Sequence, residues 1–382
     1  MIVQIINPSL KSSLNIYKNY FDSSGISFLN HSLIRTGGLS SQDSHSLSEL
    51  LQKEKVEFKE QNTGDKNNLY ILTCLPDFLK IIEGQEKSYL QKIQSTISNY
   101  INYDSIEYKI HNKKFSFNKS YVMGILNVTP DSFSDGGLYA ERGSAVKHAL
   151  QMLDEGADFI DVGGESTRPG SESVSEKEEL ARVVPIIEEI LKIRPEAIIS
   201  IDTYKAKVAE ESLKAGAKIV NDISGGTFQP EIFDVVKEFD SSIIIMHIKG
   251  TPKNMQVNPH YDNLIEEIYN FLYRQTEAAV SKGIKNILID PGIGFGKRLI
   301  NDNLEIIERL EDFKSLCYPI LIGLSKKSFL GKMLNLEVGE RELPSAVIES
   351  IAVKNGARII RTHNVKNGVQ VCELLNKINT NV

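Results

Sequence analysis

Residues Tyr121 to Gly137 read YVMGILNVTPDSFSDGG, and this stretch contains the pattern that decides the fold. An apolar run from Tyr121 to Val128, suited to a buried strand, passes directly into a segment of small, hydroxylic and glycine residues. Seven further apolar runs lead into polar or glycine-rich segments in the same way: Phe159–Gly163, Ile198–Asp202, Lys218–Ile223, Ser242–Ile248, Asn286–Asp290, Pro319–Leu324 and Arg358–His363. The sequence therefore predicts eight strands, each followed by a loop of similar character.

Longer amphipathic stretches separate many of these predicted strands. They place apolar residues at positions i, i+3, i+4 and i+7, as a helix with one buried face requires, and include Ser144–Glu155, Glu176–Lys192, Tyr204–Lys214, Tyr261–Ser281 and Leu343–Asn355. Alternation of strand and helix is typical of a parallel sheet. Eight such units favour a closed (β/α)8 TIM barrel, although periodicity alone leaves an open, doubly wound sheet as an alternative.

The N-terminal part of the chain lacks this rhythm. An apolar opening, MIVQIINP, a later apolar segment, YILTCLPDFLKII, and a helical pattern from Tyr89 to Ile101 predict a small α/β extension. Its role is unknown, and packing or oligomerisation is the simplest one. Ser105 to Lys119 predicts a hairpin that covers the bottom of the barrel. We therefore expect an extension over residues 1–104 and a barrel with its N-terminal hairpin over residues 105–382.

Composition excludes several classes of protein. The 382 residues have a net charge of -6, whereas nonspecific nucleic-acid binding depends on a surplus of Lys and Arg. The three cysteines form no CxxC pair, so neither a disulfide framework nor a thiolate zinc site is expected. The chain shows no export signal at its start and no run of 18 apolar residues. We expect a cytoplasmic protein that does not associate with membranes.

The polar segments after the predicted strands indicate where a site lies. In a TIM barrel the loops at the carboxyl ends of the strands meet at one rim and form the active face. Here eight segments would meet there: NVTPDSFSDGG, GGESTRPGSES, DTYK, NDISGG, HIKGTPKNMQ, DPGIGFGK, SKKSFLGK and HNVKNG.

In this order, the eight segments resemble those of the pterin-binding family of dihydropteroate synthases. MGILNVTPDSFSDGG and GGESTRPG are similar to its two signature segments, and the resemblance covers Tyr121 to Cys372. It implies a transferase of folate biosynthesis. Such an enzyme condenses 6-hydroxymethyl-7,8-dihydropterin pyrophosphate with 4-aminobenzoate to give 7,8-dihydropteroate and pyrophosphate.

The resemblance also implies a pterin site. A pterin has a flat edge that carries both donors and acceptors, so a buried site needs carboxylates and amides that match it. The residues implied are Asp202, Asn221, Met246, Asp290, Phe295, Lys327 and Arg361. Taken singly, these residues leave simpler roles open, because a strand-end Asp can cap a helix and Phe295 can belong to the core.

A second group of residues is implied for 4-aminobenzoate and the diphosphate: Asn127, Phe133, Thr167, Arg168, Pro169, Ser328 and His363. Asn127 is the implied protein ligand of Mg²⁺. Departure of pyrophosphate leaves a resonance-stabilised pterin cation, so positioning and charge neutralisation suffice for catalysis. The implied catalytic residues are Asp202, Asp290, Lys327, Arg361 and His363. We expect the glycine-rich loops near Phe133 and Pro169 to close over the substrates.

Two positions depart from the family pattern. Lys326 stands where the family usually has Arg, which puts a stacking or bidentate contact in question, and Ile248–Lys249 stands where Met and Gln are common. The family further implies a homodimer and inhibition by sulfonamides. Two alternatives stay open: a barrel that passes a methyl group from a reduced folate to a corrinoid, and a non-catalytic paralogue that binds pterins or only a partner protein.

Overall fold

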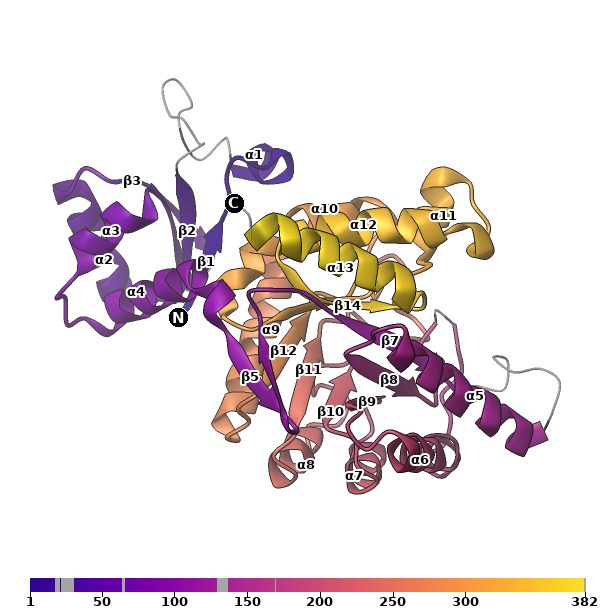
Figure 1. Cartoon of the computed structure of the whole chain (residues 1–382). Helices are drawn as coiled ribbons and strands as arrows, with labels where there is room; N and C mark the ends of the chain where they lie inside the picture. Colours follow the sequence, from indigo (N-terminus) through magenta and orange to yellow (C-terminus); the bar gives the residue numbers. More distant parts are fainter. Residues whose placement is uncertain (18–20, 22–30, 64–65, 129–136, 169, 381–382) are drawn as a thin grey trace. The chain divides into compact units, whose positions relative to one another are not determined.

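The chain forms two compact units, which are described separately (Figure 1). One comprises residues 1–106 and 305–318, and the other comprises residues 107–304 and 319–382. From the sequence we expected the boundary between the two parts at residue 104, with the segment 305–318 in the barrel. The structure is a computed structural model, and it describes residues 1–17, 21, 31–63, 66–128, 137–168 and 170–380.

The larger unit is a closed barrel of eight parallel strands, which confirms the predicted (β/α)8 TIM barrel. Each strand pairs with the next along the chain, and the last pairs with the first, with Arg361 opposite Met123. This closure rules out the open sheet. The strands are β7 (Tyr121–Asn127), β8 (Phe159–Gly163), β9 (Ile199–Asp202), β10 (Ile219–Asp222), β11 (Ser242–Met246), β12 (Ile287–Asp290), β13 (Ile320–Ile322) and β14 (Ala357–Thr362).

Helices follow the strands and cover the outside of the barrel (Figure 1). Local sequence sets their ends: Ser175 Oγ caps the start of one by accepting from the Glu178 amide at 3.2 Å, and Gly216, at φ 113°, follows the end of the next. The helices are α5 (Gly137–Asp154), α6 (Glu176–Ile193), α7 (Ala206–Lys214), α8 (Ile232–Glu238), α9 (Leu264–Ser281), α10 (Asn301–Glu308), α11 (Ser328–Leu334), α12 (Glu342–Lys354) and α13 (Val365–Thr380). Among the described residues, none of the helices is long and apolar enough to cross a membrane.

A hairpin closes the amino ends of the barrel strands. It consists of β5 (Glu107–Ile110) and β6 (Lys113–Ser116). The Tyr108 hydroxyl donates to the carbonyl of Ile287 at the start of β12 (2.9 Å), and the Phe115 ring stacks on Phe159 at the start of β8 (4.8 Å between centroids). The bottom of the barrel is thereby covered, and the opposite rim, where the polar segments lie, is left for a site.

The smaller unit has an antiparallel sheet of four strands in the order β1-β2-β4-β3. An apolar core packs helices against this sheet, which confirms an α/β extension. The strands are β1 (Ile2–Ile6), β2 (Ser32–Leu39), β3 (Glu57–Thr63) and β4 (Lys66–Thr73); the helices are α1 (Lys11–Tyr17), α2 (Ser41–Lys53), α3 (Leu75–Ile82), α4 (Ser88–Ile101) and the short η2 (Tyr103–Ser105) and η4 (Leu310–Leu316).

The segment 305–318 completes this smaller unit. The backbone N–H of Asn7, just after β1, donates to Asp312 Oδ1 at 3.0 Å, and the N–H of Ile5 donates to Ser315 Oγ at 3.3 Å. Arg309 is fully buried and donates its Nε to Asp312 Oδ2 at 2.8 Å. A segment that lies between β12 and β13 in the sequence therefore belongs to the fold of the first 106 residues.

We expect Asp312→Ala to lower the free energy of unfolding of the smaller unit by about 3 kcal/mol, because Arg309 would stay buried without its main carboxylate partner. Urea denaturation with limited proteolysis of residues 1–106 measures the effect. The control is Asp234→Ala, which removes an exposed carboxylate from α8 and should change stability by less than about 0.5 kcal/mol. Equal midpoints for both variants would show that the segment 305–318 is dispensable for this unit.

Candidate active site at the carboxyl ends of the barrel strands

The predicted polar residues meet at one level of the barrel. In the register of the strands, Asn127 lies opposite Gly163, Gly163 opposite Asp202, and Asp202 opposite Asn221. Met246, at the end of β11, lies opposite Asp290, at the end of β12. Arg361 lies in β14 with His363 just after it, and Lys327 precedes α11. Those predicted site residues that the structure describes therefore lie together at the carboxyl ends of the barrel strands.

Asp161 is the hub of the polar contacts, and sequence reasoning missed it. It lies in the middle of β8 and is fully buried, and its Oδ2 accepts from Arg361 Nε at 2.6 Å and from Asn221 Nδ2 at 2.9 Å. The other side of the same guanidinium, Nη2, donates to Asp202 Oδ2 at 2.7 Å. A charged residue within the apolar run FIDVG was the signal, because a buried carboxylate requires a partner.

This hub has more acceptors than donors. Oδ1 of Asp161 and Oδ1 of Asp202 are buried and have no hydrogen-bond partner among the described residues. Burial raises the pKa of Asp202 to about 7; the charge of Asp161 acts in the same direction, and that of Arg361 opposes it. A buried acceptor without a donor is costly, so these oxygens suit a ligand that brings its own N–H groups. Asp202 does not act as a helix cap, since α7 has Lys205 at that position.

Asp290 and Lys327 lie on the neighbouring part of the rim. Asp290 Oδ1 accepts from the backbone N–H of Gly292 at 2.7 Å, and burial raises the pKa of its carboxyl. Lys327 donates to the Ile293 carbonyl at 2.9 Å, and its Nζ lies 4.8 Å from the centroid of the Phe295 ring. Burial lowers the pKa of Lys327 to about 8, against the attraction of Asp290.

An apolar cluster lies beside these polar groups. Met246 and Phe295 belong to it together, so the structure brings these two predicted pterin residues into one wall. Its members are Ile223, Met246, Ile248 and Met255, with Tyr204, Phe228 and Phe295 packed against them. Hydrogen-bonding carboxylates beside an apolar wall form a surface suited to a flat, polar heterocycle.

The remaining predicted residues lie further out. His363 Nδ1 is 3.0 Å from Ser325 Oγ; burial and the charges of Arg361, Lys326 and Arg168 lower the pKa of His363 to about 4, so it is neutral at pH 7. Asn127 and Thr167 are half-buried, whereas Arg168 and Ser328 are exposed. Phe133 and Pro169 lie outside the described residues, as does the loop around Phe133 that we expected to close.

The variant residue Lys326 contacts the start of α12. Its Nζ lies 3.3 Å from Glu342 Oε1, and its backbone N–H donates to Ser345 Oγ at 2.9 Å. The backbone at Lys326 has φ 55°, in the left-handed region. The ion pair with Glu342 therefore gives this side chain a structural partner.

Comparison of the sequence with known proteins identifies the family of this chain. The family described as "Pterin binding enzyme" matches residues 123–363. Dihydropteroate synthase of Bacillus subtilis is 44% identical over 259 residues, which are 67% of this chain and 88% of that protein. The Clostridium beijerinckii enzyme of the same name is 47% identical over 261 residues, 67% of this chain and 94% of that protein.

Solved structures agree. A Yersinia pestis dihydropteroate synthase in a sulfonamide drug complex has a TM-score of 0.68 and 40% identity, and the match covers 72% of this chain and all (100%) of that one. A Xanthomonas albilineans dihydropteroate synthase with 4-aminobenzoic acid has a TM-score of 0.67 and 36% identity over 72% of this chain and 98% of that one. The chain therefore belongs to the pterin-binding enzymes, and among them to the dihydropteroate synthase family. It is an enzyme of the transferase class.

We expect Asp161→Asn to lower the pKa of Asp202 from about 7 toward its ordinary value, because the variant removes a neighbouring negative charge. A carboxyl whose pKa is raised by folding stabilises the folded state fully only below its unfolded pKa. That contribution is lost as pH rises through about 7. The variant should thus lose less stability than the wild type between acid and neutral pH.

Titration of the Asp202 carboxyl by ¹³C NMR and urea denaturation at several pH values measure both effects. Asp154→Asn, an exposed change on α5, is the control and should leave both curves in place. An unchanged Asp202 titration in Asp161→Asn would contradict the coupling through the hub.

Proposed function

We propose that this enzyme condenses 6-hydroxymethyl-7,8-dihydropterin pyrophosphate with 4-aminobenzoate in folate biosynthesis, giving 7,8-dihydropteroate and pyrophosphate. The observation that carries the proposal is at the barrel rim, where Arg361 holds Oδ2 of Asp161 and of Asp202 while Oδ1 of each is buried without a partner among the described residues. Relatives that are 44% and 47% identical bear the name of this synthase, and a related structure contains 7,8-dihydropteroate. The three free cysteines fit our proposal that the enzyme works in the cytoplasm.

The hub is suited to the donor edge of the pterin. That edge carries an amino group and a ring N–H, which would donate to the open oxygens of Asp202 and Asp161. Arg361 holds both carboxylates in place and favours their charged form, and Asn221 Nδ2 donates to Asp161 Oδ2, the same oxygen that accepts from Arg361. Met246 and Phe295 would contact the flat face of the ring.

The chemical step requires no covalent enzyme intermediate. The bond between the pterin methylene carbon and the diphosphate oxygen breaks, and the electron pair leaves with the diphosphate. The arylamine nitrogen then forms the new C–N bond and loses a proton to solvent or to the departing pyrophosphate. Asp202, whose side chain is 12% exposed, and the buried Asp290 would lie near the pterin and stabilise the positive charge on its methylene carbon, which is electrostatic catalysis by preorganised groups.

The outer residues would receive the diphosphate and the arylamine. Arg168 is exposed at the rim and can bind phosphate oxygens bidentately, and neutral His363 can donate a hydrogen bond from Nε2 while Nδ1 faces Ser325. Thr167 and Ser328, with Lys327, would hold 4-aminobenzoate. Phe133 and Pro169 are further proposed contacts from outside the described residues.

We propose Mg²⁺ as the cofactor, with Asn127 as its protein ligand. The amide oxygen of Asn127 is a hard donor at the rim, and Mg²⁺ usually completes its coordination with water and substrate phosphates. Among the described residues no group of three His, Cys, Asp or Glu side chains could hold a metal alone, which fits an ion that depends on the diphosphate. When bound, the ion would neutralise charge on the leaving group.

Pyrophosphate release from the pterin substrate with Mg²⁺ should depend on 4-aminobenzoate. Asp202→Asn should lower kcat/KM about 100-fold, because the variant loses a charge that stabilises the cation; Asp154→Asn should match the wild type. Methyl transfer from a reduced folate would support the methyltransferase alternative. Pterin binding without pyrophosphate release would support the non-catalytic paralogue.

We also propose a homodimer that forms through α12 and α13. Leu343, Val347 and Ile351 recur every four residues along α12 and are 74%, 52% and 42% exposed. Leu374 and Ile378, four residues apart on the adjacent α13, are 62% and 49% exposed. A contiguous apolar face of this kind is typical of an interface, and two copies of one face pair by twofold symmetry.

Val347→Lys should convert the dimer to a monomer, because it places a charge at the centre of the apolar face. Light scattering coupled to gel filtration measures the mass in solution. The matched control is Val280→Lys on α9, where the native side chain is 47% exposed and the dimer should persist. A wild-type monomer, or a Val347→Lys dimer, would refute this interface.

A further inference from the structure

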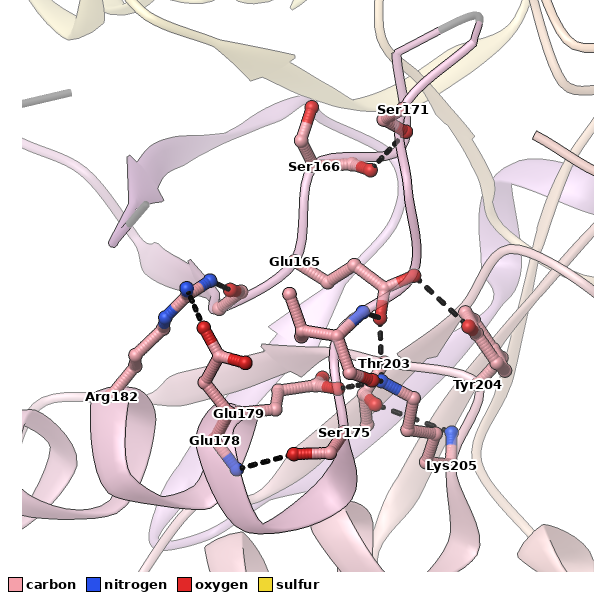
Figure 2. Close-up of polar contacts among 12 residues, drawn as sticks. Glu165, Ser166, Ser171, Ser175, Glu178, Glu179, Arg182, Thr203, Tyr204 and Lys205 are labelled. Carbon is pink, nitrogen blue, oxygen red and sulfur yellow. Dashed lines mark hydrogen bonds and ion pairs between the residues drawn. The ribbon is translucent and has the colours of Figure 1, made fainter. Parts of the chain in front are cut away.

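A buried ionic cluster lies beneath the loop that follows β8 (Figure 2). Lys205, just before α7, places its Nζ 2.5 Å from Glu165 Oε2 and 2.5 Å from Glu179 Oε2. The Tyr204 hydroxyl donates to Glu165 Oε1 at 2.9 Å. Two successive βα units contribute to the cluster, since Glu165 follows β8, Glu179 lies in α6, and Tyr204 and Lys205 follow β9.

The geometry of this cluster is tightly constrained. The side chains of Lys205, Glu165 and Glu179 are only 7%, 6% and 1% exposed. The ammonium of Lys205 uses all three of its N–H bonds, since it also donates to the Val174 carbonyl at 2.7 Å. Buried charges tolerate little displacement from their partners, unlike exposed ion pairs. The cluster therefore holds its three side chains in one position beneath the rim of the barrel.

The cluster joins the two ends of the loop from Glu165 to Val174. Glu165 Oε2 accepts from the Val174 N–H at 3.3 Å, and Lys205 holds the Val174 carbonyl. Arg182 of α6 donates to the carbonyl of Gly164, just before the loop, at 2.7 Å. Figure 2 shows the loop rising from this base to the bond between Ser171 Oγ and the Ser166 carbonyl.

Tyr204 links the base of the loop to the apolar wall. Its ring packs against the cluster that contains Met246 and meets Phe228 edge-on, with 5.4 Å between centroids. One side chain thus contacts both the wall proposed for the pterin and the carboxylate that anchors the loop. Thr167 and Arg168, the proposed contacts of the arylamine and the diphosphate, lie between the tied ends of that loop.

We propose that Glu165, Tyr204 and Lys205 are positioning residues, which hold the loop from Glu165 to Val174 so that Thr167 and Arg168 meet the arylamine and the diphosphate. The assignment of those two ligands rests on the proposed function. Glu165 and Lys205 are buried beneath the loop, and the Tyr204 hydroxyl donates to Glu165. Their effect is transmitted through the backbone of the loop, which distinguishes them from a cluster that only stabilises the barrel.

Two variants test this role. Tyr204→Phe removes one hydroxyl and no charge, so the fold should be retained, and Lys205→Met removes the central ammonium. In both, amide hydrogen exchange should become faster in residues 165–174 while the strands of the barrel keep their protection. The matched control is Lys207→Met, which removes an exposed lysine from the first turn of α7, two residues after Lys205.

Kinetics separate positioning from general stability. In Tyr204→Phe the KM for 4-aminobenzoate should rise about fivefold, as the loss of one hydrogen bond in the support would produce. The affinity for 6-hydroxymethylpterin, a probe without diphosphate, should stay within about twofold because the hub is untouched. Lys205→Met should show a larger rise in the same KM, and Lys207→Met should match the wild type.

Unchanged loop exchange in both variants, or a parallel loss of 6-hydroxymethylpterin binding, would overturn the proposal. Failure of the proposed function is recognised separately. A wild-type protein that releases no pyrophosphate in response to 4-aminobenzoate refutes that function, whereas the exchange measurement still shows whether the cluster holds the loop.

Discussion

The rest of the site depends on one guanidinium that is shared by two carboxylates, of which Asp161 is fully buried and Asp202 largely so. Arg361 reaches from β14 to Asp161 in β8 and Asp202 in β9, at 2.6 and 2.7 Å. Burying either carboxylate without this partner would be strongly unfavourable. Because β14 becomes a neighbour of β7 only when the barrel closes, the fold and the charge balance of the site depend on each other.

The same arrangement leaves the site short of donors. The guanidinium of Arg361 donates to one oxygen of each carboxylate, and Asn221 donates to the same oxygen of Asp161. The second oxygens are buried and have no partner in the part of the chain that the structure describes. Burial raises the pKa of Asp202 to about 7, so its charge is sensitive to what binds nearby. A ligand that supplies N–H groups satisfies the open oxygens, which is why a pterin edge suits this rim. Leaving these oxygens without donors is unfavourable in the free enzyme, so the site favours ligands that present N–H groups to them.

Much of the fold could be predicted because it depends on local pattern. The eight strands were expected within about two residues of where they form, since each is an apolar run that ends in polar or glycine residues. Strand-end residues such as Asp202 and Asp290 were found through the resemblance of their segments to a known family. Asp161 was missed because it lies inside a strand, and Lys205 was missed because a lysine before a helix is usually a solvated residue. The extension was predicted as α/β, but its strands β2 and β3 were not located, since their patterns are weak.

The sequence by itself determined the repeated strand-and-loop order, the eight polar segments and the family resemblance, because these follow from the types and spacing of neighbouring residues. Only the tertiary structure decided which charges pair, as Arg361 and Asp161 are 200 positions apart in the chain. It also decided that residues 305–318 complete the fold of the first 106 residues. Such contacts depend on distances set by closure and packing, and spacing along the chain carries no record of them.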